Sequence, residues 1–247
     1  MTLRSVISKL LAILVLASAA RADFLAEARD RVANGEHESA IPFFEKHLQA
    51  ASPSAEVYFE LGRSQEATGR EAEAALAYRR TLILDPSFAP AREALRNANI
   101  QLGLASPQAD WRSAVASRVP LDLLTQTGVV IFWAGAFLFA GGLFFSGTRR
   151  LKIAALMLAV VGLAAVALAW IVDPRVRDAR DSMILSQEGA VLYRTPSEDD
   201  AQKITTLAQG SVLKILSVRG RWFHGELPGG QRGWFLQKGT VMVIPPA

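Results

Sequence analysis

Two uninterrupted apolar segments in the middle of this 247-residue chain constrain its fold more than any other feature. The first runs from Gly128 to Phe145 and the second from Ile153 to Val172, and neither contains an acidic residue, a basic residue or a histidine. A helix of roughly 20 apolar residues crosses the hydrocarbon core of a bilayer, where the backbone must satisfy its own hydrogen bonds. The sequence therefore predicts a two-helix membrane hairpin in contact with lipid, with a soluble region before it and another after it.

Small residues recur in both apolar segments. Gly135 lies in the first, and Ala155, Ala159 and Gly162 lie in the second. Small side chains let membrane helices approach closely, so we expect the two helices to pack against each other. Transporters, proton relays and channels normally need ionisable groups within the membrane. Their absence from both segments of this sequence favours a simple anchor.

The N-terminus has the pattern of a secretory signal peptide. Arg4 and Lys9 precede an apolar stretch at residues 10–17, and the small residues that follow end in Ala-Arg-Ala at residues 20–22. A basic start, a short apolar core and an A-x-A site are the marks of a cleaved leader. We expect cleavage after Ala22, and an uncleaved anchor is the alternative.

The charges between the two apolar segments predict the orientation of the hairpin. Export of the N-terminal soluble region would place Arg149, Arg150 and Lys152 in a short cytoplasmic loop, as the positive-inside rule favours. The second span then returns the chain, so both soluble regions are expected in the periplasm, at the inner membrane of a bacterium. Arginines near the outer ends of the spans, including Arg118 and Arg175, oppose this argument.

The composition of the soluble regions argues against several functional classes. Residues 23–105 contain 9 Lys and Arg against 13 Asp and Glu, a net charge of −4, and residues 183–247 contain 7 against 5, a net charge of +2. Neither region has the concentrated basic face that nucleic-acid binding needs. The chain has no cysteine, and its three histidines lack the spacing of metal ligands,. We therefore expect no metal, no cofactor, no catalytic residue and no enzymatic activity.

An internal repeat with a period of 34 residues occupies residues 23–105. The paired positions are Gly35 and Gly69, Ala40 and Ala74, Phe44 and Tyr78, and Leu48 and Leu82. The second unit carries the fuller pattern, in the order Tyr58, Leu61-Gly62, Gly69, Ala74, Tyr78 and Pro86. This pattern resembles the tetratricopeptide repeat, in which Gly62 and Ala74 allow two antiparallel helices to touch and Tyr78 fills the space between units. An ordinary amphipathic helical bundle is the alternative.

Two such units are few, because helical repeat stacks need about three units for stability. The segment from Ala89 to Leu102 is expected to form a third, capping helix. The array is then either supported by this cap or completed by a partner.

The tetratricopeptide resemblance implies a concave face, formed by the first helices of the units, that binds segments of other proteins. The residues placed on this face are Leu25, Arg29, Val32, Glu56, Phe59, Arg63 and Glu66. Arg29 and Arg63 occupy equivalent positions one repeat apart, and arginines can hold a carboxylate through bidentate hydrogen bonds. A solvated helix face with surface ion pairs is the alternative.

Short β-rich runs separated by turn residues make up the region from residue 184 to residue 247. The runs are Gly189–Tyr193, Val212–Val218, Trp222–Leu227, Gly233–Leu236 and Val241–Ile244,. They resemble the bacterial SH3-like domain, a small all-β barrel. The matching residues are Val191 to Arg194, Pro196, Ser197, Leu207, Gly210, Leu213, Trp222, Gly233 and Trp234.

The SH3-like resemblance implies a groove that binds peptides or the stem peptides of the cell wall. The candidate ligand-binding residues are Tyr193, Trp222, His224 and Trp234. His224 alternates with Trp222, so the two side chains are expected on one face of a strand. The alternative is that both tryptophans are half-buried core residues of a barrel too small to hide them. Gly233 is expected to relieve crowding before Trp234.

The order of parts predicts a multi-domain membrane protein. The predicted parts are a signal peptide (1–22), a tetratricopeptide domain (23–105), a linker (106–126), a first transmembrane helix (127–146), a cytoplasmic loop (147–152), a second transmembrane helix (153–172), a linker (173–183) and an SH3-like domain (184–247). This order resembles the tetratricopeptide proteins of the bacterial Bat (aerotolerance) operons, of the BatE type.

The Bat resemblance implies a non-enzymatic scaffold in an inner-membrane complex linked to aerotolerance or envelope stress. The partners that it implies are membrane-anchored von Willebrand factor A-type proteins and, indirectly, a MoxR-type AAA+ ATPase. The alternative function is an envelope sensor that binds peptidoglycan or a peptide through the SH3-like domain.

Overall fold

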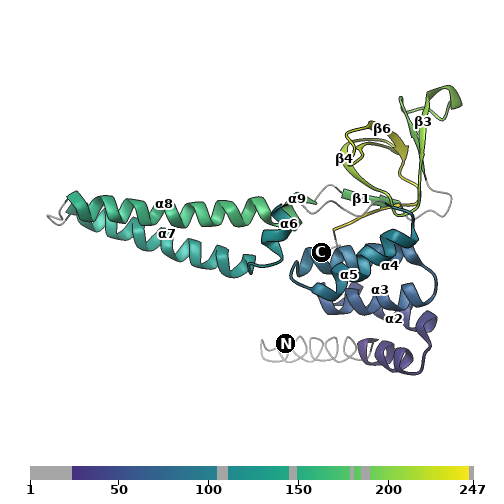
Figure 1. The fold of residues 1–247 in the computed structure, drawn as a ribbon, viewed down its shortest axis with the longest axis horizontal. Helices are drawn as coiled ribbons and strands as arrows, with labels where there is room; N and C mark the ends of the chain where they lie inside the picture. Colours follow the sequence, from purple (N-terminus) through teal and green to yellow (C-terminus); the bar gives the residue numbers. More distant parts are fainter. Residues whose placement is uncertain (1–23, 105–110, 145–148, 179–180, 185–189, 245–247) are drawn as a thin grey trace, which may run out of the picture. The chain divides into compact units, whose positions relative to one another are not determined.

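The computed structural model describes residues 24–104, 111–144, 149–178, 181–184 and 190–244 (Figure 1). The predicted signal peptide and its cleavage site lie outside the described residues, as does the start of the predicted cytoplasmic loop. The chain divides into two compact units. The first unit combines the chain before residue 107 with the chain after residue 179, and the second unit consists of residues 107–179.

The N-terminal part of the first unit is helical, as the sequence predicts. A helix over residues 24–33 is followed by α2 (His37–Ala50), α3 (Ala55–Ala67), α4 (Glu71–Leu84) and α5 (Ala89–Gln101). Consecutive helices from α2 to α5 pack against each other. Gly35 and Gly69 end the first and third helices with φ of +79° and +73°, a backbone region that is strained for other residues. The two turn glycines of the 34-residue repeat therefore have the same role.

The contact between α3 and α4 depends on a glycine and a tyrosine from the repeat pattern. A Cβ atom added to Gly62 would lie 2.5 Å from Cε1 of Tyr78. The Tyr78 ring is fully buried and packs beside Phe59, with 5.7 Å between ring centroids. The absence of a side chain at Gly62 is thus what allows the tyrosine ring to lie between the helices.

The C-terminal part of the first unit is a seven-stranded antiparallel sheet in the order β3-β2-β6-β5-β4-β1-β7. Its strands are β1 (Asp181–Ile184), β2 (Ala190–Tyr193), β3 (Lys203–Leu207), β4 (Val212–Arg219), β5 (Trp222–Glu226), β6 (Arg232–Leu236) and β7 (Thr240–Met242). A 3-10 turn at Asp200–Gln202 precedes β3. The five expected β-rich runs correspond to β2, β4, β5, β6 and β7. Two further strands, β1 and β3, lie where the sequence analysis places a linker or a turn.

The sheet is open, because β3 and β7 are edge strands that each pair with a single neighbour among the described strands. Its own core contains Leu192, Leu213, Phe223 and Phe235. A Cβ atom added to Gly233 would lie 2.6 Å from Cγ of Leu192. Gly233 therefore relieves crowding on the core side of β6, as expected from its position before Trp234.

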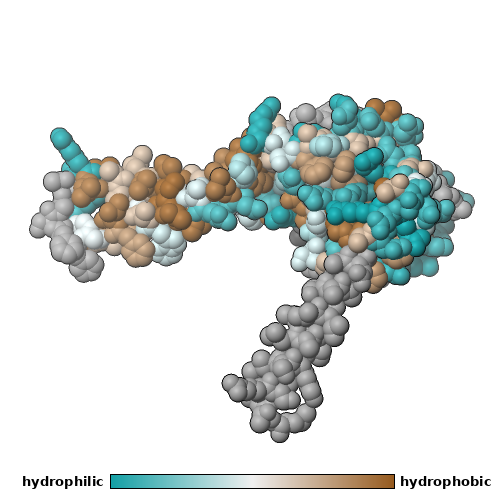
Figure 2. Space-filling view, turned by 90° about the horizontal axis from the view of Figure 1, so that it is seen from below, coloured by the Kyte–Doolittle hydropathy of each residue, from teal (hydrophilic) through white to brown (hydrophobic). Residues whose placement is uncertain are grey.

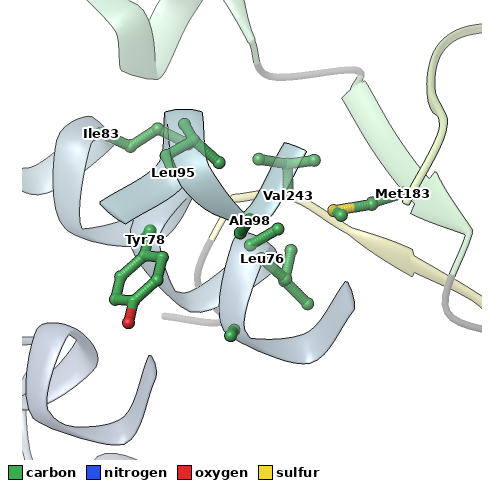
Figure 3. Close-up of a cluster of buried hydrophobic side chains, with 9 residues drawn as sticks. Leu76, Tyr78, Ile83, Leu95, Ala98, Met183 and Val243 are labelled. Atoms are coloured by element: carbon green, nitrogen blue, oxygen red, sulfur yellow. The ribbon is translucent and has the colours of Figure 1, made fainter. Parts of the chain in front are cut away.

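Hydrophobic packing in the helical part divides into two clusters. One joins the helix of residues 24–33 to α2 and α3 around Ala28, Phe44 and Leu61. The other is centred on α4 and α5, and it includes Met183 and Val243 from the sheet region (Figure 3). The helical region and the sheet thus share a core inside the first unit.

The second unit is built on two long apolar helices. Its helices are α6 (Trp111–Ala116), α7 (Leu121–Phe144), α8 (Arg149–Val172) and α9 (Pro174–Arg177). Both α7 and α8 are long and apolar enough to cross a membrane, by length and composition. Each begins several residues before the predicted span, because helical hydrogen bonding continues beyond the apolar run. In the added turn of α7, the hydroxyl of Thr125 donates to the carbonyl of Leu121 at 2.9 Å.

The predicted packing of the two apolar helices is observed at their small residues. A Cβ atom added to Gly135 would lie 2.5 Å from the backbone nitrogen of Ala159, and one added to Gly162 would collide with the backbone of Phe132. Large apolar side chains remain outside this contact. Phe137 is 71% exposed and Val130 is 67% exposed, and Figure 2 shows hydrophobic surface along this unit.

Candidate functional site

Four aromatic and imidazole side chains that the sequence analysis selects lie together on one face of the sheet. In the register of β5 and β6, His224 lies opposite Trp234, and Tyr193 of β2 lies opposite Trp234 from the other side. Trp222 precedes His224 by two residues on β5, so both point to the same side. Phe223, between them, points into the core of the sheet. We call the set Tyr193, Trp222, His224 and Trp234 the aromatic face.

The aromatic face consists of two ring pairs with different environments. Tyr193 and Trp222 meet edge to face, with centroids 5.6 Å apart and planes at 90°, and both are buried; Trp222 is only 8% exposed. His224 and Trp234 stack, with centroids 4.8 Å apart and planes at 22°, and both are half-buried. The first pair therefore belongs to the packed structure, whereas the second presents a partly accessible ring stack.

The two ring pairs relate differently to the two interpretations that the sequence left open, a ligand groove and half-buried core residues. Edge-to-face ring pairs stabilise by about 0.5–1.5 kcal/mol beyond the area that they bury, so Tyr193 and Trp222 hold β2, β5 and β6 together. The stacked His224 and Trp234 rings combine an apolar surface with imidazole and indole nitrogens, which suits contact with a peptide or another amphipathic ligand.

The second candidate site is the predicted concave face of the helical region. Three of its seven residues are apolar and contribute to packing: Leu25 and Val32 lie against the cluster around Phe44, and Phe59 lies against the cluster of α4 and α5. Phe59 also contacts the ring of Phe88, with centroids 5.1 Å apart. These three side chains therefore pack inward and stabilise the helices, and contribute little to a surface that a ligand could contact.

The polar residues of this face are partly engaged within the chain. Nε of Arg29 donates to Glu60 of α3 at 3.0 Å, and Nη2 donates to the other carboxylate oxygen at 3.0 Å. This ion pair raises the pKa of Arg29 through the hydrogen bond and the charge of Glu60, against the desolvation that lowers it. The bidentate contact expected for a ligand carboxylate is thus made to an internal carboxylate, which links the first helix to α3.

Glu66 is engaged as well, because it accepts a 2.6 Å hydrogen bond from the hydroxyl of buried Tyr78. Burial, followed by the hydrogen bond to Glu66, raises the pKa of Tyr78 far above its ordinary value. Glu56 and Arg63 remain exposed on α3. Of the predicted set, these two present charged groups most freely, and they have opposite signs.

Sequence reasoning missed Glu60 as the partner of Arg29. Glu60 follows Glu56 by one helical turn. The sequence therefore predicts both side chains on the same face of α3. The proximity of Glu60 to Arg29 was not predictable, because that depends on how two helices 31 residues apart dock. In the described ranges, no group of three or more His, Cys, Asp or Glu residues could hold a metal ion.

Comparison with known proteins adds no assignment to this geometry. No protein-family model matches the chain, and no curated protein is significantly similar to it.

Proposed function

We propose that this chain is a membrane-anchored adaptor that binds partner proteins at the periplasmic face of a bacterial inner membrane and has no enzymatic activity. The observation that carries the proposal is the second unit, in which two apolar helices pack on each other and direct large apolar side chains outward. A soluble protein rarely exposes so much contiguous apolar surface. The hairpin is thus best explained as the anchor.

The shared core of the first unit supports a hairpin with both ends on the same side of the membrane. Leu95 of α5 comes before α7 in the chain, and Met183 of β1 comes after α8, yet they lie in one buried cluster. Two spans return the chain to its starting side, whereas one span would separate these residues across the bilayer. The basic residues between the helices then favour a cytoplasmic turn and a periplasmic first unit.

The paired helices and the 34-residue repeat support a tetratricopeptide-like array as the partner-binding part. Glu56 and Arg63 provide an exposed charged surface on α3. By resemblance to the Bat proteins, the partners would be von Willebrand factor A-type proteins and, indirectly, a MoxR-type ATPase, in a complex linked to aerotolerance or envelope stress.

A second function is favoured by one observation, the partly exposed stack of His224 on Trp234. In an SH3-like domain, such a stack would bind a peptide or a stem peptide of peptidoglycan. The protein would then be an envelope sensor, with the helical region passing the signal to a partner.

Site-specific photocrosslinking in intact cells tests the adaptor. A photoreactive residue at position 63 should crosslink to a discrete membrane protein with a large extracytoplasmic domain. The same residue in place of Arg96, which is exposed on α5, serves as the matched control and should give much less product. Equal, diffuse labelling at both positions would contradict a specific partner on the α3 face.

Retention on peptidoglycan tests the sensor. The detergent-solubilised full-length protein and its Trp234→Ala variant are compared on insoluble peptidoglycan. Strong retention that the substitution abolishes would favour the sensor, and absence of retention for the unsubstituted chain would refute it.

Topology is tested separately with single cysteines, which the cysteine-free sequence allows. Ser87→Cys and Lys238→Cys should react with an impermeant thiol reagent in whole cells, and Arg150→Cys should not.

A further inference from the structure

The end of the sheet formed by β1 and β7 packs against helices α4 and α5. The cluster between them includes Leu76, Ile83 and Leu95 from the helices and Met183 and Val243 from the sheet region, all of them buried (Figure 3). Partly buried apolar residues from both sides extend it: Phe59, Leu82, Ala94 and Leu102 from the helices, and Val212, Val241 and Ile244 from the sheet region. The contact therefore has the composition of a domain core.

A half-buried arginine also holds this contact, through hydrogen bonds to main-chain groups. Arg80 of α4 donates from Nη2 to the carbonyl of Met242 at 3.1 Å and from Nε to the carbonyl of Val243 at 3.3 Å. Its guanidinium also lies 5.6 Å from the centroid of the Tyr58 ring. Desolvation lowers the pKa of Arg80. The hydrogen bonds satisfy two carbonyl groups at the end of β7 that would otherwise need water.

The chain that leaves α5 also lies against the sheet region. A Cβ atom added to Gly210, in the turn before β4, would lie 2.6 Å from Cδ1 of Leu102 and 2.8 Å from Cδ1 of Leu104. The contact thus extends from α4 across α5 to the segment that follows it.

We propose that the β1–β7 end of the sheet is the C-terminal cap of the helical array. Helical repeats cannot bury their apolar faces alone, and a terminal repeat needs a cover with a polar outer side. Here strands from the C-terminal part of the chain lie next to α5 in space. They cover the face of α4 and α5 where a further helical unit would stack. The array is closed to a partner at this end, so partners bind along the array or at its N-terminal end.

A cap of this kind also affects the order in which the parts of the chain fold. The capping residues Met183 and Val243 follow both apolar helices in the sequence. The core of α4 and α5 is therefore completed only after the hairpin has been made and the chain has returned. Stability of the helical array and structure of the sheet should be reciprocally coupled, as linkage requires for two parts of one core.

Hydrogen–deuterium exchange on the full-length protein in detergent tests the cap. Val243→Asp places a carboxylate in the shared cluster, which is costly for an unpaired charge. We expect amide exchange in α4 and α5 to accelerate by about tenfold or more. Val218→Asp is the matched control, because Val218 lies on β4 and is 61% exposed. It should leave exchange in α4 and α5 unchanged.

A second variant tests the reverse direction and does not rely on Val243→Asp remaining folded. Arg80→Met keeps an apolar stem and removes both hydrogen bonds to the end of β7. It should accelerate exchange in β1 and β7 by about tenfold. The cap is refuted if Val243→Asp changes exchange only within the sheet, or if Arg80→Met changes α4 without any effect on β1 and β7.

Discussion

The hydroxyl of Tyr78 offers a sensitive test of the helical core, because Tyr78→Phe removes one oxygen and leaves the packing of the ring intact. The ring is 0% exposed, and its hydroxyl donates to Oε2 of Glu66 at 2.6 Å. A hydrogen bond to a charged group contributes about 1.5–3 kcal/mol. Glu66 is only half-buried, so water replaces part of the lost bond. We therefore expect Tyr78→Phe to lower the free energy of unfolding by about 1.5 kcal/mol, the low end of that range.

The matched control is Tyr58→Phe. Tyr58 is almost as buried as Tyr78, but its hydroxyl makes no hydrogen bond to another described residue. We expect this substitution to change the free energy of unfolding by less than about 0.5 kcal/mol. The assay is urea unfolding of the detergent-solubilised full-length chain, followed by circular dichroism at 222 nm. Equal effects of the two substitutions would refute the assigned role of the bond.

The pH dependence of Tyr78→Phe checks the same contact independently. Burial and the bond to Glu66 raise the pKa of Tyr78 above its unfolded value of about 10,. Its contribution is thus fully present below pH 10 and is lost as pH rises further, because only the unfolded chain then releases the proton. The stability difference between wild type and Tyr78→Phe should fall by about 1.4 kcal/mol per pH unit above pH 10. A difference that stays constant from pH 7 to pH 11 would contradict the assignment.

Further substitutions test the packing at three places. Gly62→Ala should destabilise the array, because overpacking against a fixed buried ring costs about 1–3 kcal/mol and the gain in helix propensity recovers only about 1 kcal/mol; thermal unfolding measures the balance. Gly162→Leu should separate the apolar helices and lower the melting temperature in detergent, whereas Gly141→Leu, at a position with open space around it, should not. Trp222→Ala should destabilise the sheet by about 3–5 kcal/mol, and Trp234→Ala by clearly less, as followed by near-ultraviolet circular dichroism; equal losses would argue against a partly accessible Trp234.

The helical part of the fold was largely predictable, because local residues determine where its helices end and its turns lie. Gly35 and Gly69 repeat at the 34-residue spacing and mark turns that need positive φ, and Gly62 and Tyr78 of the second unit meet where α3 contacts α4. The apolar helices were predictable from composition alone. Two strands, β1 and β3, were missed, and for β1 the reason is physical. β1 has buried residues at three consecutive positions from Ser182 to Ile184, so it lacks the alternation that reveals a half-exposed strand.

The aromatic face was predictable in part, because a period of two places Trp222 and His224 on one side of β5. The pairing of His224 with Trp234 required the register between β5 and β6, which a sequence pattern does not contain. The partner of Arg29 was equally hidden, because Glu60 reaches it only through the docking of two helices. In both sites the sequence predicted the types of residue, but not the pairs that these residues form.

The shared core and the apolar hairpin constrain each other. The hairpin follows from composition in the middle of the chain, and the core follows from packing between residues on either side of it, such as Leu95 and Met183. An odd number of spans between these residues would make their contact impossible, and an independent sheet domain would leave α4 and α5 uncovered. With both features present, the pair of apolar helices is an insertion in the chain of one folded unit. Under the proposed anchoring function, the two helices would also hold the two halves of that unit on the same side of the membrane.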